Sequence, residues 1–312
     1  MSCSRFLATT VLAAVLFSGV AAAQTAAPTT GVSVRENGLV ATWFPPASGK
    51  REPVILALGG SECGEKGGHY LGQAVAALGY GALALAYCGA AGLPQDVHDL
   101  PLEYFTKALD WIEAQPLADK NRIGIYGISI GGEMALVVAA RDSRIKAVVA
   151  GVPSSVVWQG FDRHNYASVA PTYTLDGKPV PYLPYDMSKP FTSIFDLYQR
   201  SLATLPAHDD AIIPVERING PVLLFSGKAD TLWPSSEMAD QVITRLDARR
   251  FRYAHEHIAY PNAGHGSATP PGGGPWMAQL DALGGTPQGN ADAQADMWKR
   301  TIAFFQKRFG TP

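Results

Sequence analysis

The sequence predicts an α/β fold in which a mainly parallel central sheet carries helices on both faces. Short, continuous apolar segments of the kind that form buried parallel strands alternate along the chain with segments of helical periodicity. One of these apolar segments, 123–126, leads directly into a glycine-rich turn and then into a run of helix formers at 133–140. With 312 residues, of which 47% are hydrophobic and 17% charged, the chain is long enough for one such domain.

Residues 1–23 have the pattern of a secretory signal peptide. Arg5 precedes an apolar segment at 6–20, and Ala21-Ala22-Ala23 forms a small-residue cleavage site. An N-terminal membrane anchor is the alternative, but the apolar segment is short for a membrane-spanning helix. We therefore expect a soluble protein of residues 24–312, forming a single domain and exported to the periplasm or secreted.

The remaining elements are predicted from periodicity, in chain order. An alternating segment at 32–44, centred on Asn37-Gly38, predicts a hairpin. Helices are predicted at 71–78 and 235–246. Two further helices are predicted from apolar residues at helical spacing, which form one face of each helix. These residues are Phe105, Ala108, Leu109 and Ile112 in the first helix and Trp298, Ile302, Phe305 and Phe309 in the second. Strands are predicted at 54–58, 82–87, 123–126, 147–150, 222–226 and 255–260.

Residues 158–210 interrupt this alternation. The segment is rich in tyrosine and proline and has weak periodicity, although 195–205 is compatible with a helix. An insertion at this point commonly covers an active site as a cap, and an irregular surface excursion is the alternative. We favour the cap.

The turn after 123–126 places a serine where a nucleophile is expected. Gly127-Ile128-Ser129-Ile130-Gly131 fits the pattern Gly-x-Ser-x-Gly between a strand and a helix. Glycines are required there because the strained turn leaves no room for side chains beside the neighbouring strand and helix. The sequence therefore predicts Ser129 as a catalytic nucleophile, and an ordinary glycine-rich turn is the alternative.

A serine nucleophile needs a general base that is held by an acidic residue. Asp230 follows the predicted strand at 222–226, and His265 lies in a turn after the next strand, so both should reach the sheet edge where Ser129 lies. The order Ser, Asp, His is that of an α/β-hydrolase. Asp230 could instead be only an acidic residue at a helix N-terminus. Asp240 and Asp247 are poorer candidates because they fall inside or at the end of a helix.

The oxyanion of the reaction needs two backbone N–H donors. One is predicted at Ile130, directly after the nucleophile, and the other at Gly60 or Ser61, in the loop after the strand at 54–58. The alternative for Gly59-Gly60 is an ordinary tight turn.

Two cysteines remain after the predicted leader, Cys63 and Cys88, and each follows the C-terminal end of a predicted strand. In an oxidising compartment they could form one disulfide bond, and two separate buried thiols are the alternative.

Several classes of function are disfavoured. His255 and His257 could share one strand face and bind a metal, but no third ligand has suitable spacing, so no metal site is predicted. The chain has no nucleotide-binding fingerprint, and no cofactor is predicted. The net charge is −2 without a run of lysine or arginine, which argues against nucleic acid and, after leader removal, against membrane as partners. The other histidines are expected at the surface: His69, His98, His164 and His208.

Several segments spread over most of the chain match those of one known family. They are Leu58-Gly59-Gly60-Ser61-Glu62, Ala84-Leu85-Ala86-Tyr87, Gly92-Leu93-Pro94, Leu102-Glu103-Tyr104-Phe105, the Ser129 elbow with Gly131-Gly132-Glu133, Trp158-Gln159-Gly160, Ile213-Pro214-Val215-Glu216, 226–233 and 260–265. In these segments the chain resembles the C-terminal catalytic domain shared by acyl-CoA thioester hydrolases and bile acid-CoA:amino acid N-acyltransferases, within the α/β-hydrolases. This resemblance implies Ser129, Asp230 and His265 as a catalytic triad.

The resemblance implies a small-molecule acyl ester or thioester as substrate. A serine nucleophile forms an oxoester, which suits water as acceptor and favours a hydrolase over an acyltransferase that conjugates amines. We therefore expect a serine hydrolase that acts on an ester or thioester through a Ser129 acyl-enzyme. A dienelactone-hydrolase-like or peptidase-like enzyme is the first alternative. A non-catalytic binding protein on the same scaffold is the second, and the complete triad argues against it.

Overall fold

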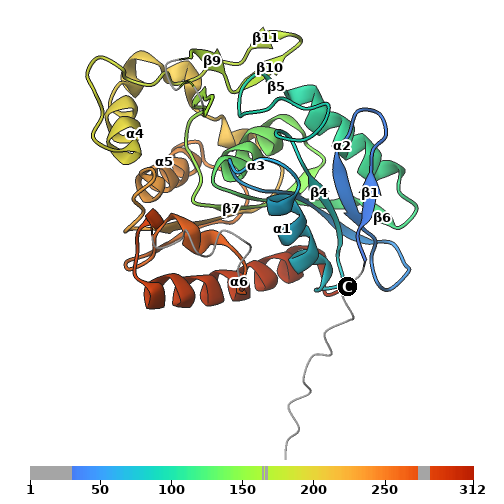
Figure 1. The fold of residues 1–312 in the computed structure, drawn as a ribbon. Helices are drawn as coiled ribbons and strands as arrows, with labels where there is room; N and C mark the ends of the chain where they lie inside the picture. The colour runs from blue at the N-terminus through green and yellow to red at the C-terminus, as the bar shows by residue number, and fades with distance from the viewer. Residues whose placement is uncertain (1–29, 164, 166–167, 273–281) are drawn as a thin grey trace, which may run out of the picture.

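The computed structural model describes residues 30–163, 165, 168–272 and 282–312. Within them the central sheet has eight strands in the order β1-β2-β4-β3-β6-β7-β12-β13 (Figure 1). Only β2 runs antiparallel to its two neighbours, and all other adjacent pairs are parallel. The strands are β1 (Val32–Val34), β2 (Ala41–Phe44), β3 (Glu52–Leu58), β4 (Gly81–Leu85), β6 (Ala118–Ile128), β7 (Ile145–Gly151), β12 (Val222–Gly227) and β13 (His255–Tyr260). The predicted mainly parallel sheet is confirmed.

The predicted hairpin is formed by β1 and β2. Asn37 and Gly38 have φ angles of 54° and 77° at the turn, which is the left-handed region that Asn-Gly turns adopt. Val34 pairs with Ala41, so Leu39 and Val40 enter the core immediately after the turn.

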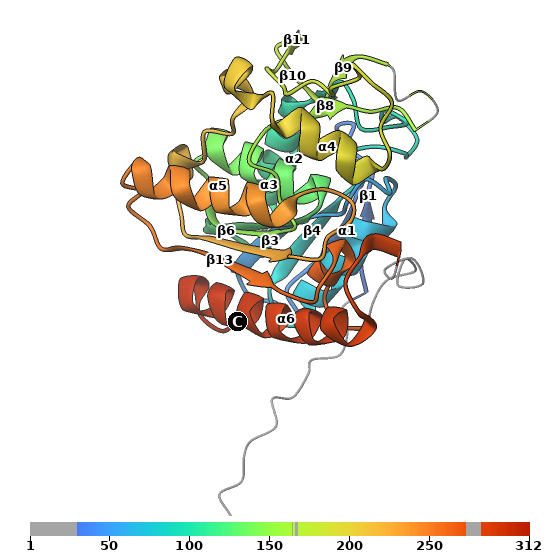
Figure 2. The ribbon, with the colours of Figure 1, turned by 90° about the vertical axis from the view of Figure 1, so that its left-hand side faces the viewer.

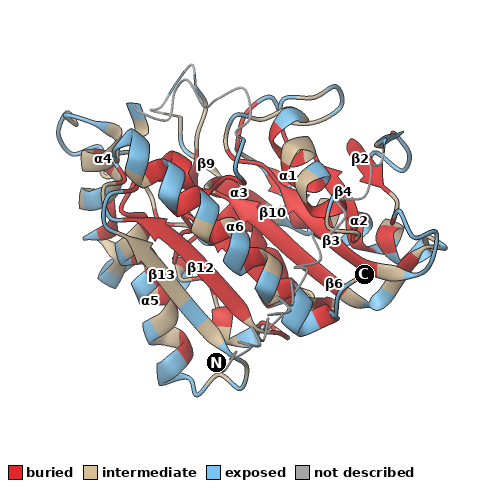
Figure 3. Ribbon diagram, turned by 90° about the horizontal axis from the view of Figure 1, so that it is seen from below, coloured by how far each residue is buried: buried red, intermediate tan, exposed pale blue. Residues whose placement is uncertain are grey.

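Helices cover both faces of the sheet (Figure 2). One face carries α2 (Leu102–Ala114), α3 (Ile130–Arg141) and α5 (Ser235–Ala248), and the other carries α1 (Lys66–Ala76) and α6 (Pro287–Phe309). Seen from below, the central strands are buried and β13, at the edge, is only partly buried (Figure 3). This layering explains the continuous apolar character of the central strands.

The predicted apolar helix faces pack on the sheet. In α2, Phe105, Ala108, Leu109 and Ile112 are all buried. In α6, Phe305 and Phe309 are buried and stack with ring centroids 6.1 Å apart, whereas Trp298 and Ile302 are only partly buried.

Helix α1 begins at Lys66, five residues before the predicted start. Its first turn contains Gly67 and Gly68, which are poor helix formers, so the sequence did not predict that the helix extends over this turn. A Cβ on Gly68 would lie 3.2 Å from the Leu85 carbonyl oxygen, so this glycine lets the helix approach β4 closely.

The segment 158–210 lies beyond the carboxyl ends of the parallel strands, above α3 and α5 (Figures 1 and 2). A separate apolar cluster links this segment to α5. Its members include Trp158 and Leu197 from the segment, Trp233 from the loop before α5, and Met238 from α5. Its short elements are β8 (Gln159–Gly160), β9 (Ala170–Pro171), β10 (Tyr173–Leu175), β11 (Lys178–Pro179), α4 (Ile194–Leu202), η1 (Leu205–Ala207) and the first part of η2 (Asp209–Ala211), with β10 pairing to β5 (Leu100–Pro101). The helix expected at 195–205 is thus three residues shorter at its C-terminal end.

Two further 3-10 helices lie outside this segment. The first, η3 (Val215–Arg217), precedes β12, and the second, η4 (His265–Ala268), follows β13.

No helix among the described residues is both long enough and apolar enough to cross a membrane. The predicted signal peptide lies outside the described residues.

Candidate active site

Ser129 lies at a sharp turn between β6 and α3. Its φ of 60° and ψ of −125° are strained values for a residue with a side chain. A Cβ on Gly127 would lie 1.9 Å from the Gly131 carbonyl oxygen, and a Cβ on Gly131 would lie 2.0 Å from the Gly59 carbonyl oxygen. The two glycines are therefore required by the close approach of turn, helix and neighbouring loop.

Ser129, His265 and Asp230 form a continuous hydrogen-bonded chain. The Ser129 Oγ lies 2.8 Å from His265 Nε2, and His265 Nδ1 lies 2.8 Å from Asp230 Oδ2. Asp230 follows β12, and His265 begins η4, which follows β13, so the three side chains meet at the carboxyl edge of the sheet. The side chains of His265 and Asp230 are only 6% and 2% exposed, which shields their interaction from water.

Asp230 also accepts hydrogen bonds at the start of α5. Its Oδ1 accepts from the backbone amides of Leu232 at 2.8 Å and Trp233 at 3.2 Å, and its Oδ2 accepts from the Ser235 hydroxyl at 2.6 Å. Asp230 thus both holds the turn that leads into α5 and contacts His265. These donors fix the carboxylate in the orientation in which it holds the imidazole.

The loop after β3 passes close to Ser129, since a Cβ on Gly60 would lie 3.4 Å from Ser129 Cβ. The Gly60 amide donates to the Glu62 carboxylate, with N and Oε1 3.0 Å apart. Among the described residues, nothing accepts a hydrogen bond from the amides of Ser61 or Ile130. Of the two alternatives predicted for the loop donor, the Gly60 amide is therefore engaged and the Ser61 amide is open, as is the predicted donor at Ile130.

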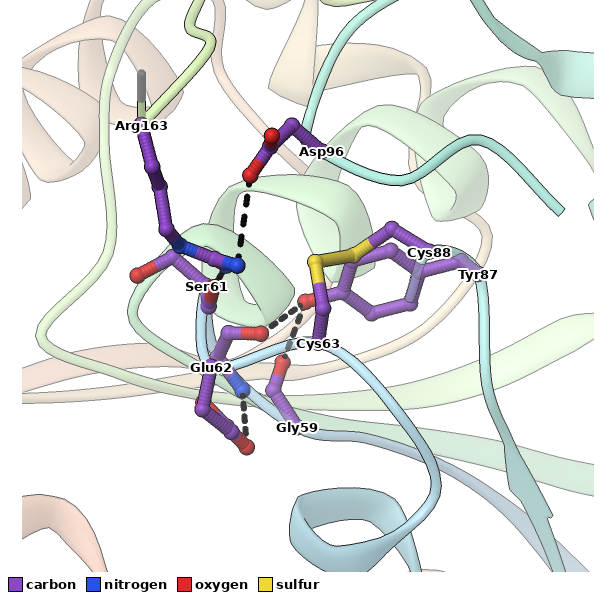
Figure 4. The surroundings of a disulfide bond; sticks show 9 residues. Gly59, Ser61, Glu62, Cys63, Tyr87, Cys88, Asp96 and Arg163 are labelled. Atoms are coloured by element: carbon purple, nitrogen blue, oxygen red, sulfur yellow. Dashed lines mark hydrogen bonds and ion pairs between the residues drawn. A yellow bond between two sulfur atoms is a disulfide. The ribbon is translucent and has the colours of Figure 1, made fainter. Parts of the chain in front are cut away.

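This loop is braced from the end of β4 (Figure 4). The Tyr87 hydroxyl lies 2.9 Å from the Gly59 carbonyl oxygen and 2.5 Å from that of Gly60. Cys63 and Cys88 form a disulfide bond with their Cα atoms 5.0 Å apart, and the Gly64 amide donates to the Cys88 carbonyl at 2.8 Å. Burial raises the pKa of Tyr87 well above its usual value, so its hydroxyl stays protonated as a donor.

Arg163, from the segment above the sheet edge, contacts the same loop. Its guanidinium donates to the Ser61 carbonyl oxygen and forms an ion pair with the buried Asp96 at 3.2 Å (Figure 4). Arg163 therefore connects the segment above the sheet edge to the loop that carries the Ser61 amide.

Two pockets meet at Ser129. The larger has a volume of about 330 Å³ and is lined by residues that include Glu62, Leu71 and His265. The smaller has a volume of about 150 Å³, is lined in part by Tyr185 and Tyr198, and is shared between the segment 158–210 and the sheet edge. Ser129 and Arg163 line both pockets.

Glu62 and Glu133 are acidic residues near the site that the sequence did not single out. Glu62 is open to the larger pocket. The surrounding protein nevertheless desolvates its carboxyl and so raises its pKa. The Gly60 hydrogen bond and the charges of Arg163 and His265 lower the pKa and partly offset this effect. Glu133, in α3, is fully buried, and burial raises its pKa well above the usual value. One signal for Glu62 was available, because it directly follows Gly59-Gly60-Ser61.

A second Ser-His-Asp chain lies on the α5 side of β12. Ser226 Oγ is 2.7 Å from His257 Nε2, and His257 Nδ1 is 2.8 Å from Asp240 Oδ1. Ser226 is fully buried and lines neither pocket beside Ser129, so substrate has no access to it through them. His255, the other half of the predicted strand pair, contacts Asp247 at 2.9 Å. The described residues contain no cluster of three metal-binding side chains.

Of the remaining histidines, His69, His98 and His208 are all partly buried. His69 lies in α1 against Phe44, and His98 and His208 lie in loops. His164 is outside the described residues.

Solved structures with a similar fold come from several kinds of hydrolase. A dienelactone hydrolase-like promiscuous phosphotriesterase from metagenomic libraries aligns with a TM-score of 0.56 at 16% identity, covering 90% of this chain and 99% of that one. A puromycin-hydrolyzing peptidase of Mycobacterium tuberculosis aligns with a TM-score of 0.57 at 16% identity, covering 91% of this chain and 40% of the peptidase. These similarities establish the α/β-hydrolase fold.

Sequence relatives are more specific. Mitochondrial acyl-coenzyme A thioesterase 2 of Mus musculus is 30% identical over 290 residues, covering 90% of this chain and 60% of the relative. Acyl-coenzyme A thioesterase 1 of Homo sapiens is 29% identical over 290 residues, covering 89% of this chain and 65% of the relative. The chain thus spans less than two thirds of either relative. A family model described as BAAT / Acyl-CoA thioester hydrolase C terminal matches residues 100–311. On this match, the chain belongs to the BAAT/acyl-CoA thioester hydrolase C-terminal family.

Proposed function

We propose that the protein is a serine hydrolase that cleaves a small-molecule carboxylic thioester or ester through a Ser129 acyl-enzyme. The observation that carries this proposal is the continuous chain from Asp230 through His265 to Ser129, with 2.8 Å at both contacts, beside two pockets. The acyl-CoA thioesterases among the relatives support thioesters as substrates.

Acylation begins at the Ser129 hydroxyl. His265 Nε2 removes its proton as Oγ attacks the substrate carbonyl carbon, and Asp230 stabilises the imidazolium that forms. The tetrahedral oxyanion is held by the backbone amides of Ile130 and Ser61, which have no described acceptor in the free protein. The carbon–sulfur or carbon–oxygen bond then breaks, and His265 returns the proton to the departing thiol or alcohol.

Deacylation repeats these steps with water. His265 removes a proton from a water molecule that attacks the Ser129 ester, and the same two amides hold the second oxyanion. Collapse releases the carboxylic acid and restores the Ser129 hydroxyl. No cofactor enters this sequence of steps.

The segment 158–210 acts as a cap in this proposal. It supplies aromatic side chains to the smaller pocket, including Tyr185 and Tyr198, and it reaches the larger pocket through Arg163. We also propose that the protein is exported after removal of residues 1–23. N-terminal sequencing of protein recovered outside the cytoplasm should begin at Gln24, and recovery of an intact Met1 terminus in the cytoplasm alone would contradict export.

The test of the activity uses acyl-CoA thioesters and p-nitrophenyl esters with the same acyl groups. The protein should hydrolyse both bond types, and the ratio of their kcat/KM values assigns the preferred bond. Ser129→Ala should lower kcat by about a thousandfold or more.

Ser226→Ala is the matched control, because Ser226 has a similar hydrogen-bonded histidine but lies outside both pockets. It should leave turnover unchanged. Full activity in Ser129→Ala would overturn the assignment of the nucleophile. Absence of turnover with every ester and thioester would favour a peptidase, or a binding protein if ligands still bind.

A further inference from the structure

The two pockets at Ser129 hold different parts of the substrate. His265 lines the larger pocket and not the smaller. Because His265 must deliver a proton to the departing sulfur or oxygen, the leaving group has to lie within reach of its Nε2. The larger pocket is therefore the side of the leaving group, and the smaller pocket is left for the acyl group.

Glu62 lines the larger pocket and not the smaller. Its carboxylate lies close to the nucleophile, because both groups are near the same point beside Gly60. A Cβ on Gly60 would stand 2.7 Å from Glu62 Oε2 and 3.4 Å from Ser129 Cβ. A leaving group bound in this pocket passes beside the Glu62 carboxylate.

Three glycines form a cradle for this carboxylate. A Cβ on Gly67 would stand 1.7 Å from Glu62 Oε1, and a Cβ on Gly59 would stand 2.6 Å from the same atom. The Gly60 amide donates to that oxygen at 3.0 Å. The local sequence thus holds the carboxylate in place at the pocket wall, where any side chain on these glycines would displace it.

The charge of Glu62 is not neutralised by an ion pair with any described residue. The guanidinium of Arg163, which also lines this pocket, is instead paired with Asp96 at 3.2 Å and donates to the Ser61 carbonyl oxygen. Figure 4 shows Arg163 directed to Asp96 and Ser61, and the Glu62 carboxylate on the far side of Ser61 from Asp96. Much of the remaining lining is apolar, such as Leu71.

We propose that Glu62 is a specificity-determining residue that selects the leaving group by charge. It favours a thiol or alcohol that carries a positive charge or an N–H donor within a few bonds of the scissile sulfur or oxygen, and it disfavours one that carries an anion there. Coenzyme A satisfies this rule, because an amide N–H lies two carbons from its sulfur and its phosphates lie far along the chain. The proposal rests on the hydrolase function proposed above and adds the class of leaving group.

The test compares three thioesters of one acyl group at pH 8. Their leaving groups are thiocholine, which is cationic, its neutral carbon isostere 3,3-dimethylbutanethiol, and the anionic 3-mercaptopropionate. In the natural protein, kcat/KM for the cationic thioester should exceed that for the anionic one by at least about tenfold, with the neutral one between them. Glu62→Gln should move this ratio toward one, because glutamine keeps an acceptor for the Gly60 amide and removes the charge.

Comparing substrates within each variant cancels any general loss of activity or of folded protein. Glu65→Gln is the matched control, since Glu65 lies three residues away, outside both pockets, and pairs with Arg35 at 2.6 Å. It should keep the ratio of the natural protein. Equal ratios in the natural protein and Glu62→Gln, or a preference for the anion, would overturn the proposal while leaving the hydrolase function intact. Failure to cleave any of the three thioesters, or any ester, would instead reject the hydrolase function itself.

Discussion

The hydroxyl of Tyr87 lies 2.5 Å from the carbonyl oxygen of Gly60 and 2.9 Å from that of Gly59. The Gly60 carbonyl belongs to the same peptide unit as the Ser61 amide. Because a peptide unit is planar, fixing the carbonyl oxygen on one side fixes the direction of the N–H on the other. Tyr87 therefore sets the direction of the amide that we propose as an oxyanion donor.

We expect Tyr87→Phe to lower kcat for thioester hydrolysis by roughly tenfold with little change in KM, because a misdirected donor weakens binding of the oxyanion more than of the ground state. Steady-state kinetics with one acyl-CoA thioester measure both constants. A rise in KM at constant kcat would contradict a role in positioning the oxyanion donor.

Tyr80→Phe is the control for loss of a buried tyrosine hydroxyl. Tyr80 is also buried, and its hydroxyl donates to the Gly310 carbonyl oxygen at 2.9 Å, away from the pockets. It should lower thermal stability by an amount similar to Tyr87→Phe and leave kcat unchanged.

The disulfide bond acts on the same loop. Cys63 and Cys88 are 25 residues apart, so the bond removes conformational freedom from the unfolded chain. The double change Cys63→Ser and Cys88→Ser should lower the free energy of unfolding by about 3 kcal/mol, measured by urea titration. Kcat should fall as well, because the loop that carries the Ser61 amide loses one of its attachments. A reductant should destabilise the natural protein and have no effect on the double variant; equal stability of the two proteins without reductant would contradict the prediction.

The triad could be predicted from sequence because each member follows a strong local pattern. Gly-x-Ser-x-Gly between strand and helix predicts Ser129, and Asp230 follows a strand whose continuous apolar character predicts a buried parallel sheet. His265 lies in the turn after the next predicted strand, 255–260. Parallel strands place their carboxyl ends at one edge, so the three residues had to lie near one another. The strand alternation that predicts the fold therefore also predicts the site.

The residues around the triad could not be predicted in the same way. Tyr87 reaches the loop after β3 because β4 lies beside β3, and its role depends on where a single hydroxyl lies after its strand has ended. Glu62 depends on the direction of one side chain in a loop. Arg163 comes from a segment whose strands are only two or three residues long, too short for a periodic signal.

The charge preference assigned to Glu62 should depend on pH. Desolvation raises the pKa of Glu62 above 4.5, opposed by the Gly60 hydrogen bond and by the charges of Arg163 and His265. The preference for the cationic over the neutral thioester, neither of which titrates in this range, should be complete above this raised pKa. It should disappear as the pH falls through it, because the Glu62 carboxyl becomes neutral. The ratio of kcat/KM values measures this directly, since any pH effect on the reaction that is common to both substrates cancels. Glu62→Gln should give a flat profile, and a pH-independent ratio in the natural protein would contradict the assignment to Glu62.

Glu133 gives a prediction on stability. Its carboxyl is fully buried in α3, and burial raises its folded-state pKa well above 4.5, although the neighbouring Tyr173 hydroxyl and Trp158 backbone partly oppose this. A carboxyl with a raised folded pKa contributes stability below its unfolded pKa and loses that contribution as the pH rises through the folded pKa. Glu133→Gln removes the titration in a side chain of the same shape.

The variant should therefore gain stability relative to the natural protein as the pH rises from 4.5 toward 8, by about 1–2 kcal/mol across the transition. Thermal unfolding of both proteins at closely spaced pH values measures the difference. Glu256→Gln, at an exposed position in β13, controls for removal of one negative charge and should give a difference that varies little with pH. A constant difference between the melting temperatures of Glu133→Gln and the natural protein from pH 4.5 to 8 would contradict this prediction. It would mean that Glu133 has the same pKa in the folded and unfolded chain, so that burial does not govern its charge.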